Sequence, residues 1–348
     1  MRRVHIEVAP AYDVFIGDGA LASLQAGDRR MAIVIDEAVQ RIHGERIATL
    51  LAGRRFETFV LPSGERHKTL QTAETLYNWL AQRHFERSEP MVAVGGGVCG
   101  DLTGFVAATW RRGVPFFQVP TTLLAQVDSS VGGKVAVDHP AGKNLIGAFH
   151  QPRQVLADTS FLRTLPSREI WAGLGEVVKT ALLAGEPLLS LVAKNLDAVA
   201  AGESPLEEVV AACVSFKAGV VQRDPHEHGE RAILNLGHTV GHALEKVGGY
   251  EQFLHGEAVV YGLRAALALS DLPKNSPAWK LVQAMKVPPL GPMDAGAVIE
   301  AMKDDKKVSG GRVRFVLLPE IGKPKWGCEL PPERVRAVVD QLLSGALG

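Results

Sequence analysis

Cysteine is scarce in this chain of 348 residues, and its distribution excludes several classes of protein. The three cysteines, Cys99, Cys213 and Cys328, are far apart and form no Cys-x-x-Cys pair. A disulfide framework and a zinc site built on thiolates are therefore not expected. We expect instead a protein of a reducing compartment, the cytoplasm.

The chain also has neither an excess of one charge sign nor a long apolar run. Lysine plus arginine and aspartate plus glutamate both number 38, which gives a formal net charge of zero. Proteins that bind nucleic acid or a membrane surface usually show a basic excess, so neither partner is expected. No apolar run is long enough to span a bilayer, and the first residues lack the apolar segment of a signal peptide.

Apolar residues are abundant, at 46% of the chain, and in the first half they follow one pattern. Short β-branched runs alternate there with helical stretches, which is typical of βαβ units and a mostly parallel sheet. The pattern predicts a helix at residues 72–83 and strands at 4–8, 14–16, 31–35, 56–61, 91–94 and 116–119.

The second half is different, because helical patterns follow one another from about residue 162. They predict one late strand at 313–318 and helices at 168–183, 188–199, 206–222, 238–247, 256–270 and 278–285. We therefore predict an α/β domain over residues 1–160 and a mainly helical domain over residues 161–348.

A glycine-rich segment follows one of the predicted strands and opens a helix. Gly95, Gly97 and Gly100 have the G-x-G-x-x-G spacing of loops that let backbone amides approach a pyrophosphate. The segment departs from the usual fingerprint, because it is not on the first strand and no acidic residue follows about twenty positions later. Asp36, at the end of an earlier strand, could accept hydrogen bonds from ribose hydroxyls instead. The alternative is that the glycines serve only tight strand–helix packing.

Two further loops combine glycine with lysine, at residues 127–134 and 142–147. Each pairs flexible backbone with a cation, which suits phosphate or sugar hydroxyls. Neither loop fits the pattern G-x-x-x-x-G-K-S/T, so an ATPase is not supported. Each could alone be a solvated turn, but two such loops so close together favour ligand binding.

Histidine and glutamate cluster in the helical half. His238 and His242 are four positions apart, so on a helix they share one face. His255 begins another apolar helical run, and Glu176 lies in a third. Two imidazoles and one carboxylate are the ligand set of an open, catalytic zinc site. The spacing points first to His238 and His242 as the two imidazoles, and the alternative is that the histidines cap or fill a helical core.

Charged residues lead up to this cluster from Lys217 onward. Such a run is by default a solvated helix face. Arg231, Asn235, His238 and His242 nevertheless recur at spacings of three or four, so one face could carry a phosphate-binding arginine and a metal-binding histidine together. A second charged run, at residues 304–307, predicts a solvated segment.

Taken together, these segments resemble the 3-dehydroquinate synthase family, which catalyses the second step of the shikimate pathway toward chorismate and the aromatic amino acids. The resemblance covers nearly the whole chain and is most specific at residues 120–134 and 234–242. It departs from the family pattern at Asp138, where asparagine is common.

The resemblance implies a Rossmann-like nucleotide-binding α/β domain and a C-terminal mainly helical metal-binding domain, with the active site in the cleft between them, in a homodimer. It implies tightly held NAD and one divalent metal, zinc or cobalt. The implied metal ligands are Glu176, His238 and His255, which moves His242 to the substrate pocket. The implied NAD contacts are Asp36, Glu65, Lys68, Gly95, Gly96, Gly97, Asp101, Thr121, Thr122 and Lys143. The implied catalytic and substrate contacts are Arg112, Asp128, Lys134, Asn144, Lys179, Lys217, Glu227, Arg231, Asn235, His242, Lys306 and Lys307.

The implied reaction converts 3-deoxy-D-arabino-heptulosonate 7-phosphate to 3-dehydroquinate and phosphate. Its steps are transient oxidation by NAD, β-elimination of phosphate, re-reduction and intramolecular aldol closure. Other readings stay open: another sugar-phosphate cyclase such as an aminodehydroquinate synthase, a metal-dependent polyol dehydrogenase of the same architecture, or a catalytically dead binding protein.

Overall fold

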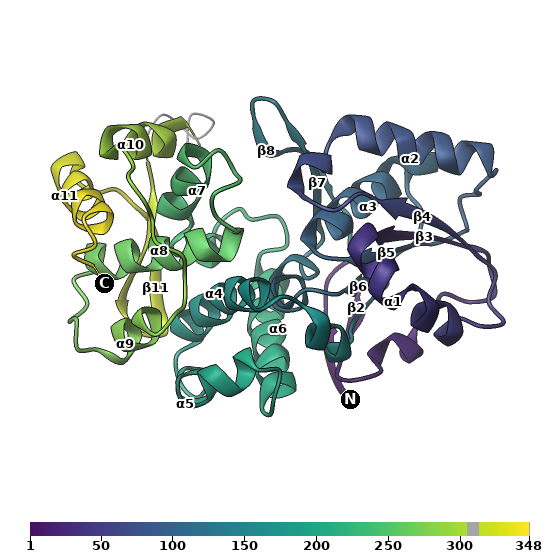
Figure 1. The fold of residues 1–348 in the computed structure, drawn as a ribbon, viewed down its shortest axis with the longest axis horizontal. Coiled ribbons are helices and arrows are strands. Elements are labelled where there is room, and N and C mark those ends of the chain that lie inside the picture. The colour runs from purple at the N-terminus through teal and green to yellow at the C-terminus, as the bar shows by residue number, and fades with distance from the viewer. Residues whose placement is uncertain (305–312, 348) are drawn as a thin grey trace. The chain divides into compact units, whose positions relative to one another are not determined.

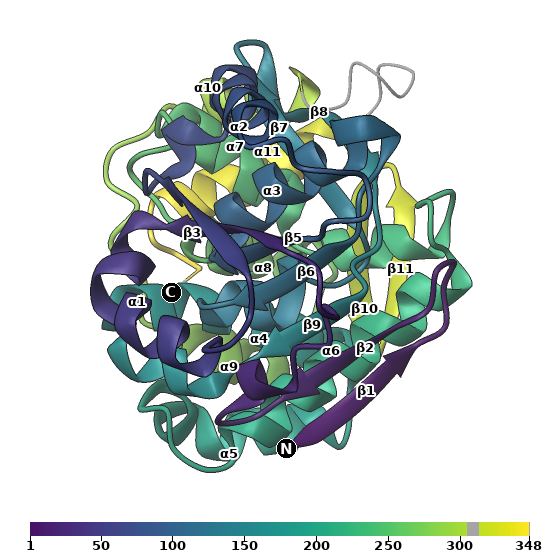
Figure 2. The same ribbon diagram turned by 90° about the vertical axis from the view of Figure 1, so that its right-hand side faces the viewer.

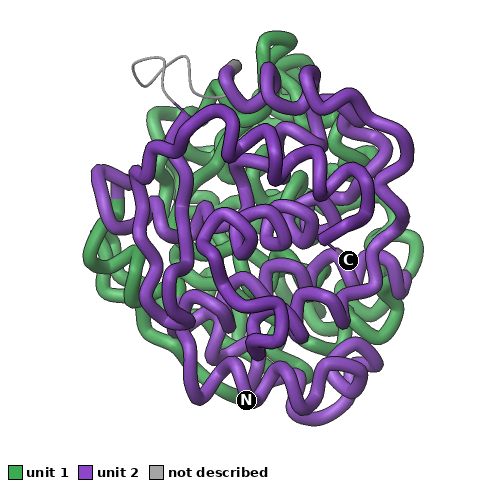
Figure 3. The backbone as a smooth tube through the Cα atoms, turned by 90° about the vertical axis from the view of Figure 1, so that its left-hand side faces the viewer, with its two compact units in different colours: residues 1–165, 217–225 green, residues 166–216, 226–348 purple. Residues whose placement is uncertain are grey.

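The chain forms two compact units in the computed structural model, which describes residues 1–304 and 313–347. Unit 1 comprises residues 1–165 and 217–225, and unit 2 comprises residues 166–216 and 226–348 (Figure 3). The return of 217–225 to unit 1 was not predicted from the sequence. The functional division at residue 160 stays a prediction.

A seven-stranded sheet forms the centre of unit 1 (Figures 1 and 2), with the strand order β1-β2-β9-β6-β5-β3-β4. Every neighbouring pair in it is parallel except β1 and β2. The strands are β1 Arg2–Ile6, β2 Tyr12–Ile16, β3 Met31–Asp36, β4 Phe56–Leu61, β5 Met91–Gly95, β6 Phe116–Pro120 and β9 Gln154–Ala157. The predicted parallel sheet is confirmed.

Both faces of this sheet are buried, which explains why its central strands are almost continuously apolar. Along β3, Ala32 and Val34 join a core with α2 (Leu70–Gln82) and α3 (Gly97–Thr109). Met31, Ile33 and Ile35 alternate with them and join a second core with α1 (Glu37–Leu50), a helix that the sequence did not predict. The carboxyl ends of β3 and β5 lead directly into α1 and the glycine segment.

An antiparallel hairpin of β7 (Lys134–His139) and β8 (Gly142–Phe149) follows the sheet's central strands. The sequence predicted loops at residues 127–134 and 142–147. The first ends where β7 begins, whereas residues 142–147 are strand and not loop, because Gly142 pairs with His139 and Gly147 with Ala136.

Unit 2 is mainly helical, as predicted. Its helices are α4 Ser167–Ala184, α5 Leu188–Ala200, α7 His238–Val247, α8 His255–Leu269, α9 Pro277–Gln283, α10 Ala295–Asp304 and α11 Pro332–Leu343, with α6 Leu206–Arg223 shared with unit 1. Strands β10 (Phe315–Glu320) and β11 (Lys323–Cys328) pair antiparallel. Sequence reasoning foresaw neither β11 nor the helices α10 and α11.

Short helical turns connect these elements. They are Ala20–Ser23, Glu65–His67, Trp110–Arg112, Thr159–Thr164 and Glu230–Asn235, which are 3-10 helices, and Ala125–Ser129, which is a π-helix. Within the described residues, none of the helices combines the length and the hydropathy that crossing a bilayer requires.

Glycines bring α4, α7 and α8 unusually close together. A Cβ atom at Gly256 of α8 would lie 1.8 Å from the carbonyl oxygen of Ala172 in α4. A Cβ atom at Gly262 would lie 1.9 Å from the carbonyl oxygen of Gly237, just before α7. Real side chains do not approach backbone this closely, so only glycine permits these crossings. The three helices carry Glu176, His238 and His255.

Candidate active site

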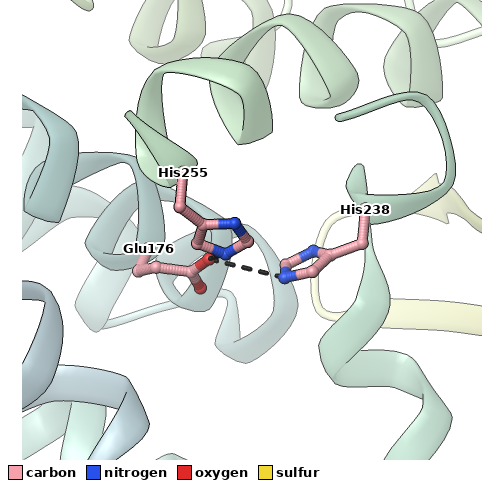
Figure 4. A group of neighbouring side chains, drawn as sticks. All are labelled: Glu176, His238 and His255. Atoms are coloured by element: carbon pink, nitrogen blue, oxygen red, sulfur yellow. Dashed lines mark ion pairs between the residues drawn. The ribbon is translucent and has the colours of Figure 1, made fainter. Parts of the chain in front are cut away.

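Three side chains of unit 2 converge from three helices (Figure 4). Glu176 lies in α4, and His238 and His255 are the first residues of α7 and α8. The Nε2 atoms of His238 and His255 lie 3.5 and 3.3 Å from Oε1 of Glu176. All three offer ligand atoms that lie within 4.8 Å of one another. The geometry therefore groups His238 with His255 around Glu176, whereas the four-residue spacing had pointed to His238 and His242.

The carboxylate of Glu176 has the environment of a metal ligand. Glu176 is fully buried, and neither carboxylate oxygen accepts a hydrogen bond, although Nζ of Lys179 lies 2.5 Å from Oε2. Burial disfavours its charge, but Lys179 and the two histidines hold the pKa of Glu176 well below its usual range. A buried anion lacking hydrogen bonds is costly, and a divalent cation would compensate it. One carboxylate and two imidazoles suit zinc or cobalt.

The hydrogen bonds of the two histidines decide which nitrogen faces Glu176. Nδ1 of His238 lies 3.2 Å from the carbonyl oxygen of Leu236, which can only accept, so Nδ1 carries the proton. Burial, assisted by the charge of Lys179, lowers the pKa of His238 to about 3, so the ring is neutral.

His255 has a carboxylate on each side of its ring. Its Nδ1 lies 3.1 Å from Oε2 of Glu245, and its Nε2 faces Glu176. Burial lowers the pKa of His255, but the carboxylates of Glu176 and Glu245 on either side of the ring outweigh burial and raise the pKa to about 10. A proton therefore competes with any cation for this ring.

His242 lies beside this group without belonging to it. Its ring centroid is 5.2 Å from that of His238 and 5.8 Å from that of His255. His242, Glu245 and His255 form a second group of close ligand atoms. The partly exposed imidazole of His242 can carry a proton next to the first group.

The charged approach to α7 corrects two expectations. Arg231 is buried and Asn235 donates from Nδ2 to Oε1 of Glu227 (3.2 Å), so this segment is not a solvated helix face. Residues 230–235 form a 3-10 helix, and Gly237, with φ of 81°, separates that turn from α7. Arg231, Asn235 and the two histidines of α7 therefore do not lie along one continuous helix, because the left-handed glycine breaks it.

In unit 1, the glycine segment joins β5 to α3. Gly95 ends the strand and α3 begins at Gly97, so the first backbone N–H groups of the helix have no acceptor within it and could bind an anion. The backbone N–H of Thr121, the first residue after β6, donates to Gly95 O at 2.9 Å. Thr121 and Thr122 thus follow the neighbouring strand at the same edge of the sheet.

Asp36 stands where the sequence expected it, at the carboxyl end of β3. Its Oδ1 accepts from the backbone N–H of Ala38 (2.9 Å) and from the hydroxyl of Ser63 (2.8 Å), and so caps α1. Any role toward ribose hydroxyls would be additional to this cap.

A polar network joins two of the expected nucleotide residues of unit 1, Lys68 and Asp101, with Asn144, an expected substrate contact. Nζ of Lys68 lies 2.6 Å from Oδ2 of Asp101 and 2.5 Å from Oδ1 of Asn144. Asp138 accepts from the backbone N–H of Asn144 at 2.8 Å. Burial raises the pKa of Asp101 although Lys68 opposes the shift. A separate ion pair joins Lys143 to Glu65 at 3.3 Å.

The return of α6 to unit 1 is explained by Lys217. Its Nζ donates to Oδ1 of Asp128 at 2.8 Å and to the backbone oxygen of the same residue at 2.7 Å. Lys217 is only 8% exposed, so the expectation of a solvated helix face is wrong here as well.

The remaining expected residues are placed differently. Arg112 and Lys134 are exposed on unit 1. Arg112, Asn144 and Glu227 share a left-handed backbone, with φ of 63°, 55° and 59°. Such conformations are costly for residues other than glycine and often mark functional positions. Lys306 and Lys307 lie outside the described residues.

Sequence reasoning missed Glu245. It is only 3% exposed, and its Oε2 lies within hydrogen-bonding distance of Nδ1 of His255. A signal was present, because Glu245 follows His238 by seven positions and His242 by three, so all three share one face of α7.

Solved structures with this fold define a class of enzyme. The chain is similar to a 2-deoxy-scyllo-inosose synthase complexed with carbaglucose-6-phosphate, NAD+ and Co2+ (TM-score 0.88, 26% identity, 97% of this chain and 99% of that one). It is also similar to 2-epi-5-epi-valiolone synthase from Streptomyces hygroscopicus with NAD+ and Zn2+ bound (TM-score 0.86, 26% identity, 96% and 97%). The predicted architecture, an α/β domain followed by a helical domain, is that of these cyclases. Glycerol dehydrogenase from Schizosaccharomyces pombe, at 16% identity and a TM-score of 0.66, shares the fold alone (95% and 88%).

Sequence comparison narrows the class. Models of the 3-dehydroquinate synthase N-terminal and C-terminal regions match residues 58–172 and 173–308. Curated relatives named 3-dehydroquinate synthase include one from Azotobacter vinelandii (42% identical; 95% of this chain, 94% of the relative) and one from Halorhodospira halophila (44%; 99% and 99%). The chain belongs to the 3-dehydroquinate synthase family, and the predicted family is confirmed.

Proposed function

We propose that this enzyme is a carbon–oxygen lyase that converts 3-deoxy-D-arabino-heptulosonate 7-phosphate to 3-dehydroquinate and phosphate, and that it depends on NAD and one divalent metal. The observation that carries the proposal is the buried group of Glu176, His238 and His255 in a chain 42–45% identical to named 3-dehydroquinate synthases. NAD+ and Co2+ or Zn2+ are bound in similar solved cyclases, which supports both cofactors.

Glu176, His238 and His255 would hold the metal, and the first turn of α3 with Gly95–Gly97 would hold the NAD pyrophosphate. The bound metal would supply Lewis acidity toward a substrate hydroxyl, and NAD would supply reversible hydride acceptance. The other proposed NAD contacts of unit 1 are Asp36, Glu65, Lys68, Asp101, Thr121, Thr122 and Lys143.

Four cationic side chains would bind the carboxylate and the phosphate of the substrate: Lys134, Lys179, Lys217 and Arg231. Such charge matching positions the reacting atoms and stabilises the charge that develops as phosphate leaves. His242 would move a proton, since its ring lies beside those of His238 and His255. The remaining proposed substrate contacts are Arg112, Asp128, Asn144, Glu227, Asn235, Lys306 and Lys307.

Two alternatives are less well supported. The sister cyclases among the solved structures share 26% identity with the chain, against 42–45% for relatives named 3-dehydroquinate synthase. The likeness to glycerol dehydrogenases is at 16–18% identity and concerns the fold. A homodimer in the cytoplasm remains part of the proposal.

One assay tests the proposal against both alternatives. The purified enzyme, with Zn2+ or Co2+ and NAD+, is given the heptulosonate phosphate, and released phosphate and absorbance of NADH are followed together. We expect phosphate and 3-dehydroquinate to accumulate over many turnovers without NADH. NADH equal to the consumed substrate would indicate a polyol dehydrogenase, and phosphate release from another sugar phosphate but not from this one would indicate a sister cyclase.

A further inference from the structure

Glu245 faces the nitrogen of His255 that points away from Glu176. Its Oε2 lies 3.1 Å from Nδ1 of His255, whereas Nε2 of the same ring lies 3.3 Å from Oε1 of Glu176. Glu245 is 3% exposed, so water screens this contact little. A carboxylate at Nδ1 keeps the proton on that atom and leaves the lone pair on Nε2.

His238 obtains the same orientation by a different route. The carbonyl oxygen of Leu236 lies 3.2 Å from its Nδ1, so backbone performs for His238 what Glu245 performs for His255. Both rings consequently present Nε2 to one oxygen of Glu176.

The backbone of His255 is fixed independently of Glu245. Glu257 accepts from the backbone N–H of Leu254 at 2.8 Å, and Arg168 donates to both oxygens of Glu257 at 2.7 and 2.8 Å. These contacts secure the first turn of α8, where His255 stands. What Glu245 adds is control of the ring.

We propose that Glu245 is a positioning residue that fixes the ring of His255, so that Nε2 faces the cation held with Glu176 and His238. This inference rests on the metal site of the proposed function. Outer carboxylates of this kind orient a ligand imidazole and increase its basicity.

The second group of close ligand atoms, formed by His242, Glu245 and His255, offers a different role for Glu245. A cation on that side would need Nδ1 of His255 and would leave the proton on Nε2, toward Glu176. The two roles therefore require opposite tautomers. The buried carboxylate of Glu176 has both Nε2 atoms at 3.5 and 3.3 Å from Oε1, and this convergence favours the cation on its own side.

The test measures Zn2+ affinity of metal-stripped protein by competition with a chelator, for the wild type and for Glu245→Ala, Glu245→Gln and Glu251→Gln. We expect Glu245→Ala to bind Zn2+ about 10–100-fold more weakly. Glu245→Gln should fall in between, because an amide oxygen accepts from Nδ1–H but carries no charge. The exposed Glu251 precedes His255 by four residues, and its variant should match the wild type.

Nitrogen NMR of the zinc-loaded proteins supplies a readout that mere destabilisation would not change. The Nδ1–H signal of His255, identified by its loss in His255→Gln, should be protected from exchange in the wild type and exchange faster in both Glu245 variants. If Glu245→Ala does not fold, Glu245→Gln and this signal decide the matter.

Three results separate the possible failures. Wild-type protein that binds no Zn2+ would refute the proposed metal site itself. Wild-type affinity in both Glu245 variants, with normal wild-type binding, would refute the positioning role alone. A loss as large as that of His255→Ala would make Glu245 a direct ligand and overturn the inference.

Discussion

Polar side chains are arranged in opposite ways in the two units. In unit 1, Lys68 is paired with Asp101 and Asn144, and Asp36 already caps a helix. In unit 2, the carboxylate of Glu176 is fully buried, yet its oxygens accept no hydrogen bond. Polar side chains of unit 1 thus satisfy one another, whereas the carboxylate of Glu176 lies against Lys179 without accepting a hydrogen bond, and a metal would add to that pairing. The difference suggests that substitutions in unit 1 should act first on folding, and substitutions in unit 2 first on metal binding.

The largest effect is expected at Glu176. Glu176→Gln keeps the shape but removes the anionic ligand, so bound zinc should be lost and kcat should fall by more than ~100-fold, since even outer partners of metal ligands cost 10–100-fold. Metal content by mass spectrometry and phosphate release check this. Glu203→Gln, at an exposed glutamate of the same unit, is the matched control. Full metal retention in Glu176→Gln would show that the ligand set is wrong.

Arg231→Ala should raise the KM for the sugar phosphate by roughly 10–150-fold, corresponding to about 1.5–3 kcal/mol for a hydrogen bond to a charged group. Affinity for NAD+ should change little, because Arg231 belongs to unit 2 and the nucleotide segment to unit 1. Steady-state kinetics and NAD+ titration measure the two values on one preparation. Equal losses for both ligands would remove Arg231 from the substrate contacts.

Breaking the paired network should cost stability. Lys68→Met leaves Asp101 without its cation, and we expect a loss of about 1–3 kcal/mol in the free energy of unfolding of the metal-free protein. Urea denaturation measures it. The double variant Lys68→Met/Asp101→Asn should recover part of the loss, because both charges are then gone. Additive losses in the double variant would mean that the pair is not coupled.

The smallest effect is expected on the alkylation rates of two buried thiols, one in each unit. Cys99 belongs to unit 1 and Cys213 to unit 2. Burial raises the pKa of Cys99 to about 12, so its thiol should react only after local opening. Zn2+ at ten times its Kd should slow alkylation of Cys213 about tenfold through stabilisation of unit 2 and leave Cys99 nearly unchanged. Equal protection of both thiols would show that the units open together.

The thiol of Cys99 also makes the stability of the protein depend on pH, in a direction that follows from its raised pKa. The folded-state pKa of Cys99 is raised from 9.0 to about 12, so its contribution to stability is complete below pH 9 and is lost as the pH rises toward 12. Cys99→Ala should flatten this part of the stability profile, as measured by urea unfolding at several pH values.

Patterns local in the sequence predicted the fold well. Strand β4 and helix α7 have the predicted bounds, because β-branched runs and 3.6-residue periodicity fix each element locally. Long-range pairing was not readable. The hairpin at 134–149 depends on the pairing of β7 with β8, and the return of α6 depends on Lys217 reaching Asp128. The metal group followed from the family resemblance, whereas Glu245 needed coordinates that place its carboxylate against His255.

The glycines at the crossings of α4, α7 and α8 have a consequence for engineering. A methyl group at Gly256 or Gly262 would collide with backbone oxygen and push apart the helices that carry the proposed ligands. The size of the proposed metal site is therefore set by two positions that touch no metal, substrate or cofactor. Attempts to retune the enzyme for a larger or smaller ion will have to redesign these crossings, and a mutational scan should find both positions intolerant of every substitution.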